Sequence, residues 1–99
     1  MTFIHVAAFV WKDEVDSGLL GEALSRALRE YVAEIEGVVS YDCGPDVGFT
    51  PGASDFAVVG RFVSRSVFVD YRDDERHQNI LAELIVPNLA SRAVVQLGE

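Results

Sequence analysis

The sequence predicts a single α+β domain with the element order β-α-β-β-α-α-β. Its 99 residues suffice for one domain, residues 1–99, and not for two. Four segments hold β-branched and aromatic residues in short runs that are typical of strands. Three others repeat apolar residues at the three- and four-residue spacing of helices. Glycine, proline and aspartate separate these segments and mark the turns.

The first strand and the first helix carry the clearest patterns. Residues 3–11 are apolar on both alternations apart from His5, as in a strand that is covered on both faces. Asp16 or Ser17 can cap the helix that follows, which should run for about five turns and end at Gly37 as its C′ residue. Its apolar face is expected to consist of Leu20, Leu24, Ala27, Leu28, Tyr31 and Ile35.

The middle of the chain predicts a pair of strands joined by a loop. The strands are expected at residues 38–43 and 55–63. The intervening residues, 44–53, are rich in glycine and proline, and Gly44-Pro45 and Pro51-Gly52 are turn signals.

The C-terminal third predicts two short helices and a last strand. Ser64 can cap a helix over residues 65–72, and Asp73-Asp74 can cap the next one. Pro87 should end or kink that second helix, and residues 92–97 are expected to form the fourth strand.

This order of elements is that of the ferredoxin-like split βαβ unit, with its second helix divided in two. It gives one four-stranded antiparallel sheet with the helices on one face. The other face is also apolar, because the first strand is apolar on both alternations, and 49% of the residues are hydrophobic. We therefore expect an apolar pocket, and a second copy that covers the bare face so that two sheets pack together as a homodimeric α/β barrel.

The charge and the cysteine count argue against several classes of partner. A net charge of −8 without a basic run disfavours nucleic acid and anionic membrane surfaces. Cys43 is the only cysteine, and no Cys/His cluster has the spacing of a zinc site, so neither a metal nor another cofactor is expected. Without a signal-peptide pattern or an apolar run of about 20 residues, the expected location is the cytoplasm.

Three stretches share their order and spacing with one known family. They are His5-Val6-Ala7-Ala8-Phe9-Val10-Trp11-Lys12-Asp13, Ile35-Glu36-Gly37-Val38-x-Ser40-Tyr41-x-x-Gly44-x-Asp46 and Tyr71-Arg72-Asp73-Asp74-Glu75-Arg76-His77-Gln78. Together they resemble the stress-responsive A/B-barrel family over nearly the whole chain. In the third stretch Asp74-Glu75 stands where the family has His-Pro, so no role of that missing histidine is carried over.

The resemblance implies a fold and a small set of site residues. The family fold is a ferredoxin-like unit that dimerises through its sheet. One plant branch acts as a polyketide cyclase without metal or cofactor, through a tyrosine and a histidine at the Tyr-x5-His spacing that Tyr71 and His77 share. His5 matches a strand histidine that lines the same pocket. The implied ligand is small and hydrophobic or polyketide-like, and the implied catalytic residues are Tyr71, His77 and His5.

These side chains suit proton transfer at carbon. His77 falls in the first turn of its helix, where the helix dipole disfavours an imidazolium and Asp73-Asp74-Glu75 favours it. An imidazole base near neutral pH is therefore expected. Leu81 and Leu84 share the face of His77, which should point inward. Tyr71 can donate a hydrogen bond to a developing enolate oxygen.

Each of the three residues also has a purely structural interpretation, which the sequence leaves open. A histidine in an acidic turn is often a structural hydrogen-bonding group. A tyrosine such as Tyr71 on an apolar helix face is often a core residue whose hydroxyl is satisfied. His5, the one polar residue of its strand, can likewise be a core histidine with an internal partner.

Three further features are assigned no chemistry. Arg61 in the third strand is expected to form a surface or intersubunit ion pair or to extend toward solvent. Cys43 has no basic neighbour that would activate its thiol. The loop over residues 44–52 lacks the spacing and the lysine of a phosphate-binding loop, and we expect it near the dimer edge or the pocket mouth.

Three functions are compatible with the sequence. The first is a cofactor-independent, cyclase-like activity in which His77 is the base, Tyr71 the donor and His5 an orienting group. The second is a non-catalytic dimer that binds a hydrophobic metabolite or has a stress-related role. The third, ranked last, is a cofactor-free or haem-degrading monooxygenase of the same fold. The haem-degrading enzymes carry an asparagine on the first strand, and this chain has none there.

Overall fold

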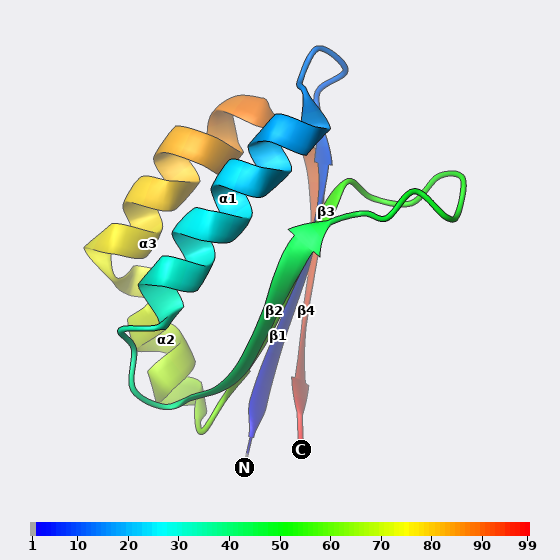
Figure 1. Cartoon of the computed structure of the whole chain (residues 1–99). Coiled ribbons are helices and arrows are strands. Elements are labelled where there is room, and N and C mark those ends of the chain that lie inside the picture. Colours follow the sequence, from blue (N-terminus) through cyan, green and yellow to red (C-terminus); the bar gives the residue numbers. More distant parts are fainter. Residues whose placement is uncertain (1) are drawn as a thin grey trace.

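A computed structural model describes residues 2–99 as one antiparallel sheet with every helix on one face (Figure 1). The strand order is β2-β3-β1-β4, so β1 lies between two neighbours. The predicted α+β class, the ferredoxin-like sheet and the element order are confirmed. The elements are β1 (Phe3–Trp11), α1 (Ser17–Val32), β2 (Val38–Pro45), β3 (Phe56–Phe62), α2 (Arg65–Asp73), α3 (Glu75–Ile80), the π-helical turn η1 (Leu81–Ile85), the 3₁₀ turn η2 (Val86–Asn88) and β4 (Leu89–Gly98).

Strand β1 has the bounds and the two apolar faces that its sequence predicts. Its odd-numbered side chains face the helices, and Ala7, Phe9 and Trp11 are buried there in the main core. Its even-numbered side chains face the opposite side, where Ile4 lies between its cross-strand neighbours Arg61 and Leu97. Because β1 pairs with β3 and β4 along its length, its backbone is satisfied on both edges.

Helix α1 starts as predicted but ends earlier. The Asp16 side chain accepts a hydrogen bond from the backbone of Leu19 at 3.0 Å, which fixes the N-terminus. The helix stops at Val32, so the prediction of Gly37 as its C′ residue is wrong. Gly37 has a φ of +89° and instead lies in the turn that leads into β2. Ile35 continues the apolar pattern beyond the helix because it packs on the core from that turn.

The other predicted boundaries that failed lie at strand ends. Gly44-Pro45 belongs to β2, paired with Ala57 and Phe56, and is not a turn. β2 is an edge strand, where the missing N–H of proline is tolerated. β4 begins at Leu89, three residues before its predicted start, because its pairing with β1 continues past a bulge to Trp11.

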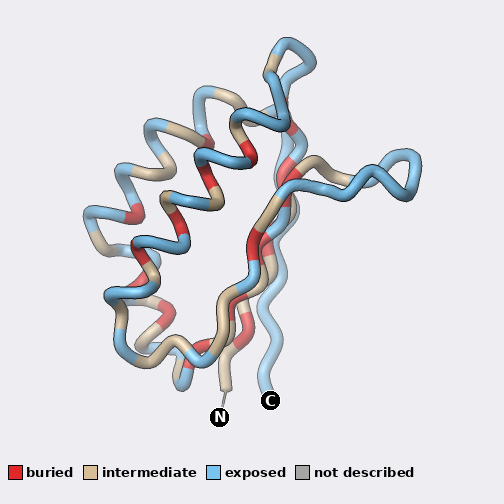
Figure 2. The backbone as a smooth tube through the Cα atoms, in the orientation of Figure 1, coloured by how far each residue is buried: buried red, intermediate tan, exposed pale blue. Residues whose placement is uncertain are grey.

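The hydrophobic core lies between the helices and the three strands β2, β3 and β1. One cluster gathers around Phe9, Leu24 and Phe56, and a second around Phe62 and Tyr71. Figure 2 shows these buried positions along the facing sides of α1 and the sheet, whereas β4 is exposed along almost its whole length. The helical layer therefore stops short of the β4 edge, and this position determines where a cavity can form.

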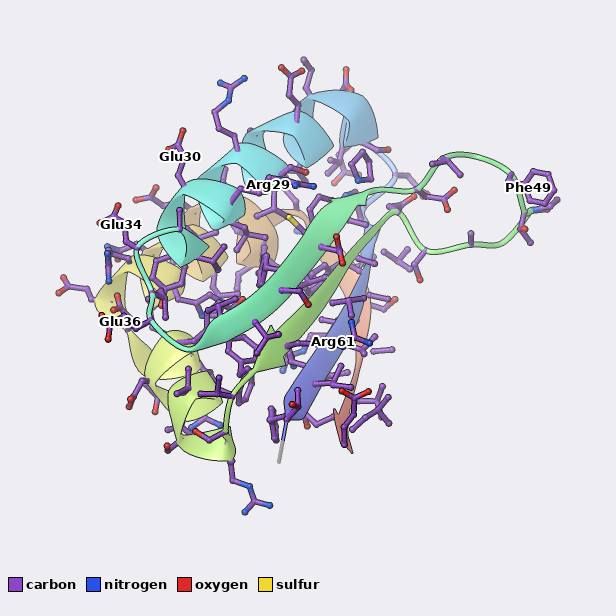
Figure 3. All side chains as sticks on the ribbon, turned by 60° about the horizontal axis from the view of Figure 1, so that its bottom comes forward. Arg29, Glu30, Glu34, Glu36, Phe49 and Arg61 are labelled. Carbon is purple, nitrogen blue, oxygen red and sulfur yellow. The ribbon has the colours of Figure 1, made fainter. Side chains whose placement is uncertain are left out.

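The face of the sheet opposite the helices is apolar and open. Val95 and Leu97 on β4 are 51% and 52% exposed there, and Val10, further along β1 opposite Ser91, is 37% exposed. Arg61 lies on the same face (Figure 3). Its guanidinium is 4.0 Å from the Glu99 carboxylate, which makes an ion pair within the chain. No helix within residues 2–99 is long and apolar enough to cross a membrane.

Candidate functional site

A cavity of about 660 Å³ lies at the edge of the sheet that the helices leave uncovered. α1 packs over β2, and α2 packs against β1 and β3. One wall of the cavity is therefore the helix-facing side of β4, with Arg92, Val94 and Gln96, and the other wall comes from α2, α3 and η1. Apolar side chains from β1 and the core form its floor.

The three residues that the sequence singles out all line this cavity. His5 comes from β1, Tyr71 from α2 and His77 from α3. Tyr71 and His77 are buried, and His5 is partly buried. The rings of Tyr71 and His77 are 4.5 Å apart between centroids, and the ring of Phe68 lies 4.8 Å from that of His5.

A sharp corner between α2 and α3 brings Tyr71 and His77 together. Asp74 has an extended backbone that ends α2, and its carboxylate accepts a hydrogen bond from the Arg76 backbone at 2.8 Å to start α3. The corner folds His77, in the first turn of α3, back onto the last turn of α2. The acidic turn that replaces the family His-Pro pair thus acts as a helix cap.

The imidazole of His77 is fixed in one tautomer. Its Nδ1 lies 3.0 Å from the carbonyl oxygen of Arg72. A carbonyl oxygen can only accept, so Nδ1 carries the proton and donates, which leaves Nε2 unprotonated in the neutral ring. Nε2 forms no hydrogen bond with any side chain or backbone group in the described part of the chain. His77 therefore offers a basic nitrogen with a fixed orientation.

Burial keeps His77 neutral. Desolvation lowers the pKa of His77 below its ordinary value of 6.5, and the hydrogen bond to Arg72 and the charges of Asp74 and Asp73 oppose this only in part. The sequence analysis expected the helix dipole to oppose these carboxylates, but the main opposing effect is desolvation. The ring is thus an unprotonated base at neutral pH.

Tyr71 is held by two other tyrosines. Its hydroxyl lies 2.7 Å from the hydroxyl of Tyr41 on β2, and either oxygen can be the donor. The Tyr31 hydroxyl donates to the Tyr71 carbonyl oxygen at 2.8 Å. Burial raises the pKa of Tyr71 and of Tyr41, so both phenols stay protonated at neutral pH. Tyr71 is therefore a hydrogen-bond donor and not an anion.

His5 is held from the neighbouring strand. The Gln96 side-chain nitrogen lies 3.0 Å from His5 Nδ1, and the two residues face each other across the β1–β4 ladder. Desolvation, together with the nearby His77 and Arg92, lowers the pKa of His5 to about 4. The neutral ring can accept the Gln96 hydrogen bond at Nδ1 and present Nε2–H to a ligand.

Sequence reasoning missed Tyr41, Gln96 and Arg92 as parts of this site. Tyr41 alternates with Cys43 on the helix-facing side of β2, so strand periodicity could have placed it toward Tyr71. Gln96 and Arg92 could have been found only with the register of β4 against β1, because they face His5 and Phe9 across the ladder. The sequence of β4 taken alone does not determine how β4 pairs with β1.

The features that were assigned no chemistry lie away from the cavity. Cys43 is buried on β2, and burial raises the pKa of its thiol, which agrees with a structural role. The loop between β2 and β3 lines no part of the cavity, which excludes the pocket mouth, and its other expected place, the dimer edge, stays a prediction. It projects past the open face of the sheet, with Phe49 near its tip (Figure 3). No group of three or more His, Cys, Asp and Glu side chains within residues 2–99 is arranged to hold a metal ion.

Comparisons with known proteins agree on one family. The model of the stress-responsive A/B-barrel domain matches residues 3–97. A dimeric ferredoxin-like protein of unknown function from Thermobifida fusca is 35% identical, with a TM-score of 0.89 over 100% of this chain and 92% of that one. Among curated proteins, none matches this sequence.

More distant structures share the fold alone. A dimeric protein of unknown function and ferredoxin-like fold from Bacteroides fragilis is 18% identical, with a TM-score of 0.85 over 99% of this chain and 96% of that one. A hydroxynitrile lyase from Passiflora edulis is 12% identical, with a TM-score of 0.78 over 97% of this chain and 91% of that one. The family match and the 35% identical structure carry the assignment: the chain belongs to the stress-responsive A/B-barrel family.

Proposed function

We propose that this protein binds a small apolar carbonyl compound in the cavity beside β4 and moves a proton from one of its carbon atoms without a metal or cofactor. The observation that carries the proposal is the pairing of His77 with Tyr71. The unprotonated Nε2 of His77 has no partner among the described residues, and the protonated phenol of Tyr71 lies beside the same ring. Base and donor thus share one apolar space.

The residues support an enolisation followed by an intramolecular aldol closure. Nε2 of His77 takes a proton from the carbon next to a ketone, and the Tyr71 hydroxyl donates a hydrogen bond to the enolate oxygen that forms. In this proposal the Tyr41 hydroxyl takes the donor role in its 2.7 Å contact with the Tyr71 hydroxyl, which leaves the proton of Tyr71 for the ligand. The enolate carbon then attacks a second carbonyl of the same chain, as in a polyketide cyclase, and the first ketone is restored. The C=O π bond of the attacked carbonyl opens to an alkoxide, which takes back the proton that Nε2 of His77 removed in the first step. His5, through Nε2–H, orients that second carbonyl.

The working unit of this proposal is a homodimer. The open face of the sheet carries Val10, Val95 and Leu97, which are exposed in the single chain. A second copy that packs its own sheet there would remove this apolar surface from water. The similar proteins from Thermobifida fusca and Bacteroides fragilis are both described as dimeric, which supports the same assembly here.

Proton exchange tests the proposed chemistry. A medium-chain β-keto ester in deuterated buffer loses the proton signal of the carbon between its carbonyl groups, and the wild-type protein should speed this loss. Tyr71→Phe and His77→Gln should each remove most of the acceleration, by about 100-fold or more for the base. Asp70→Asn is the control on the same helix, because Asp70 is exposed and lies outside the cavity lining, and this variant should keep the acceleration. Exchange that is unchanged in both cavity variants would rule out the assigned roles.

A second candidate function is ligand binding without catalysis. It is favoured by the internal hydrogen bonds that His5, Tyr71 and His77 already make, as residues with structural roles do. In that case an apolar ligand should raise the melting temperature of the wild type and of His77→Gln equally, with no proton exchange. A ligand whose stabilising effect is lost in His77→Gln would argue against this alternative.

A further inference from the structure

We infer that the loop between β2 and β3 is an arm whose apolar tip packs onto a second copy of this chain. The arm comprises residues 46–55, and its tip holds Val47 and Phe49. These are the two most exposed large apolar side chains within residues 2–99, at 90% and 89%. The inference rests on the homodimer of the proposed function and adds to it a contact outside the two packed sheets.

The base of the arm is fixed to the end of the sheet. The Asp46 backbone N–H donates to the Asp55 carbonyl oxygen at 2.9 Å, and the Asp55 N–H donates to the carbonyl oxygen of Phe9 on β1 at 2.8 Å. The Asp55 carboxylate also accepts a hydrogen bond from the Trp11 backbone at 2.8 Å. Nearer the tip, the Asp46 carboxylate accepts one from the Gly48 backbone at 2.8 Å. These bonds fix the direction in which the arm leaves the sheet.

The arm points to the side on which the second copy would pack. It projects away from the helices and past the open face of the sheet (Figure 1), with Phe49 near its tip (Figure 3). Two sheets that pack face to face lie about 10 Å apart. Phe49 follows Asp46 by three residues, and three extended residues span about 10 Å. The side chain of Phe49 can therefore reach the sheet of a second copy.

The charges of the arm and of the open face favour a second copy over a charged partner. Residues 47–54 contain no charged side chain. Among the described strand residues of the open face, only Asp42 and Arg61 are charged, and their charges cancel. Two chains that each carry a net charge of −8 can thus approach at this face without a local clash of charge. A second copy would bury the tip and the open face in one continuous apolar contact.

A sedimentation equilibrium measurement tests how much the tip contributes. Phe49→Ser should raise the dimer dissociation constant by about 100-fold, because a dimer with a twofold axis loses the same apolar contact twice. Leu19→Ser is the matched control, because Leu19 is exposed on α1, on the helical side of the molecule. This control should leave the dissociation constant within about twofold of the wild type.

Photocrosslinking identifies what the tip touches. Phe49 is replaced by p-benzoylphenylalanine, an aromatic residue that bonds covalently to a neighbouring C–H group under ultraviolet light. We expect a covalent species of twice the chain mass of 10.9 kDa, with the new bond in a strand or in the arm of the second copy. The same residue in place of Leu19 should give no such species.

The outcomes separate the arm from the rest of the account. A dissociation constant that Phe49→Ser leaves unchanged, or a crosslink to a helix of the second copy, would overturn the inference while the homodimer stands. A wild-type protein that is monomeric in the same experiment would overturn the inference and the homodimer together. The proton-exchange assay decides the proposed chemistry independently, because the arm lines no part of the cavity.

Discussion

Three titratable side chains of the cavity, those of His77, Tyr71 and His5, are each held by a hydrogen bond with another residue. The Arg72 carbonyl fixes the tautomer of His77, Tyr41 holds the hydroxyl of Tyr71, and Gln96 holds His5. Desolvation keeps these three groups neutral at neutral pH. A neutral base next to a neutral donor is the state that carbon-proton abstraction requires.

The pH dependence of proton exchange should report on His77. Because burial lowers the pKa of His77 below 6.5, the ring stays neutral until the solution is more acidic than that value. The exchange rate of the β-keto ester, corrected for the protein-free reaction, should fall on acidification with a midpoint below pH 6.5. A decline with its midpoint at or above 6.5 would contradict a buried, neutral His77.

His5 should make stability depend on pH over a defined window. Its pKa is about 4 in the folded chain against an ordinary value of 6.5. Between these two values the unfolded chain binds more protons, so the free energy of unfolding falls as the pH is lowered from 6.5 to 4. We expect a loss of roughly 2 kcal/mol, allowing for partial solvent contact. Urea unfolding of the wild type and of His5→Gln at several pH values measures the free energy of unfolding. If this free energy changes equally with pH in both proteins, the assignment to His5 is refuted.

At the scale of elements, a single glycine makes room for the tyrosine pair. Gly60 lies on β3 opposite Tyr41, and a Cβ there would be 2.9 Å from the Phe62 ring and 3.2 Å from the Tyr41 ring. Phe62 is fully buried and cannot move aside without displacing the core. The close approach of β3 to these rings thus determines where Tyr41 meets Tyr71.

Gly60→Ala should therefore destabilise the fold by about 1–3 kcal/mol through overpacking. It should also slow proton exchange, because Tyr41 would be displaced from Tyr71. Gly44→Ala is the control in the neighbouring strand, since a Cβ at Gly44 meets nothing within 4 Å. Chemical denaturation gives both free energies of unfolding. Equal stability of the two variants would show that the space around Gly60 is not restrictive.

The elements that the sequence predicted well are those whose local pattern agrees with their packing. β1 and the start of α2 at its Ser64 cap are examples. The errors lie where pairing or packing overrides the local signal. Gly44-Pro45 reads as a turn but pairs with β3, and Leu89 extends β4 because β1 offers it a partner. Strand pairing depends on residues that are far apart in the sequence. The local pattern of one segment therefore does not determine it.

The candidate site was predictable to a similar degree. Spacing and resemblance identified Tyr71, His77 and His5, and these three line one cavity. The side chains that hold or surround them, such as Tyr41 and Gln96, come from other strands. Their positions depend on how the strands pair, which explains why sequence analysis found the central residues but not their partners.

For the whole molecule, the open sheet face gives a test of assembly. Val95→Glu places a charge in the middle of the proposed dimer interface, where burial without a partner is costly. Light scattering should give twice the chain mass of 10.9 kDa for the wild type and a shift toward the single-chain mass for the variant. Val86→Glu makes the same change on η2, at a residue that is also exposed, and should remain dimeric. A wild-type protein that is monomeric at low micromolar concentration would refute the dimer.

The central claim is that this fold presents the bare Nε2 of a neutral His77 to a ligand cavity. Long-range ¹H–¹⁵N correlation spectra of the histidine rings at pH 7 test it most directly, with His77→Gln used to assign the signals. We expect His77 to show the Nδ1–H tautomer, with an unprotonated Nε2 whose signal shifts when the β-keto ester is added. A charged ring, an Nε2–H tautomer, or an Nε2 signal that does not respond to the β-keto ester would contradict the account.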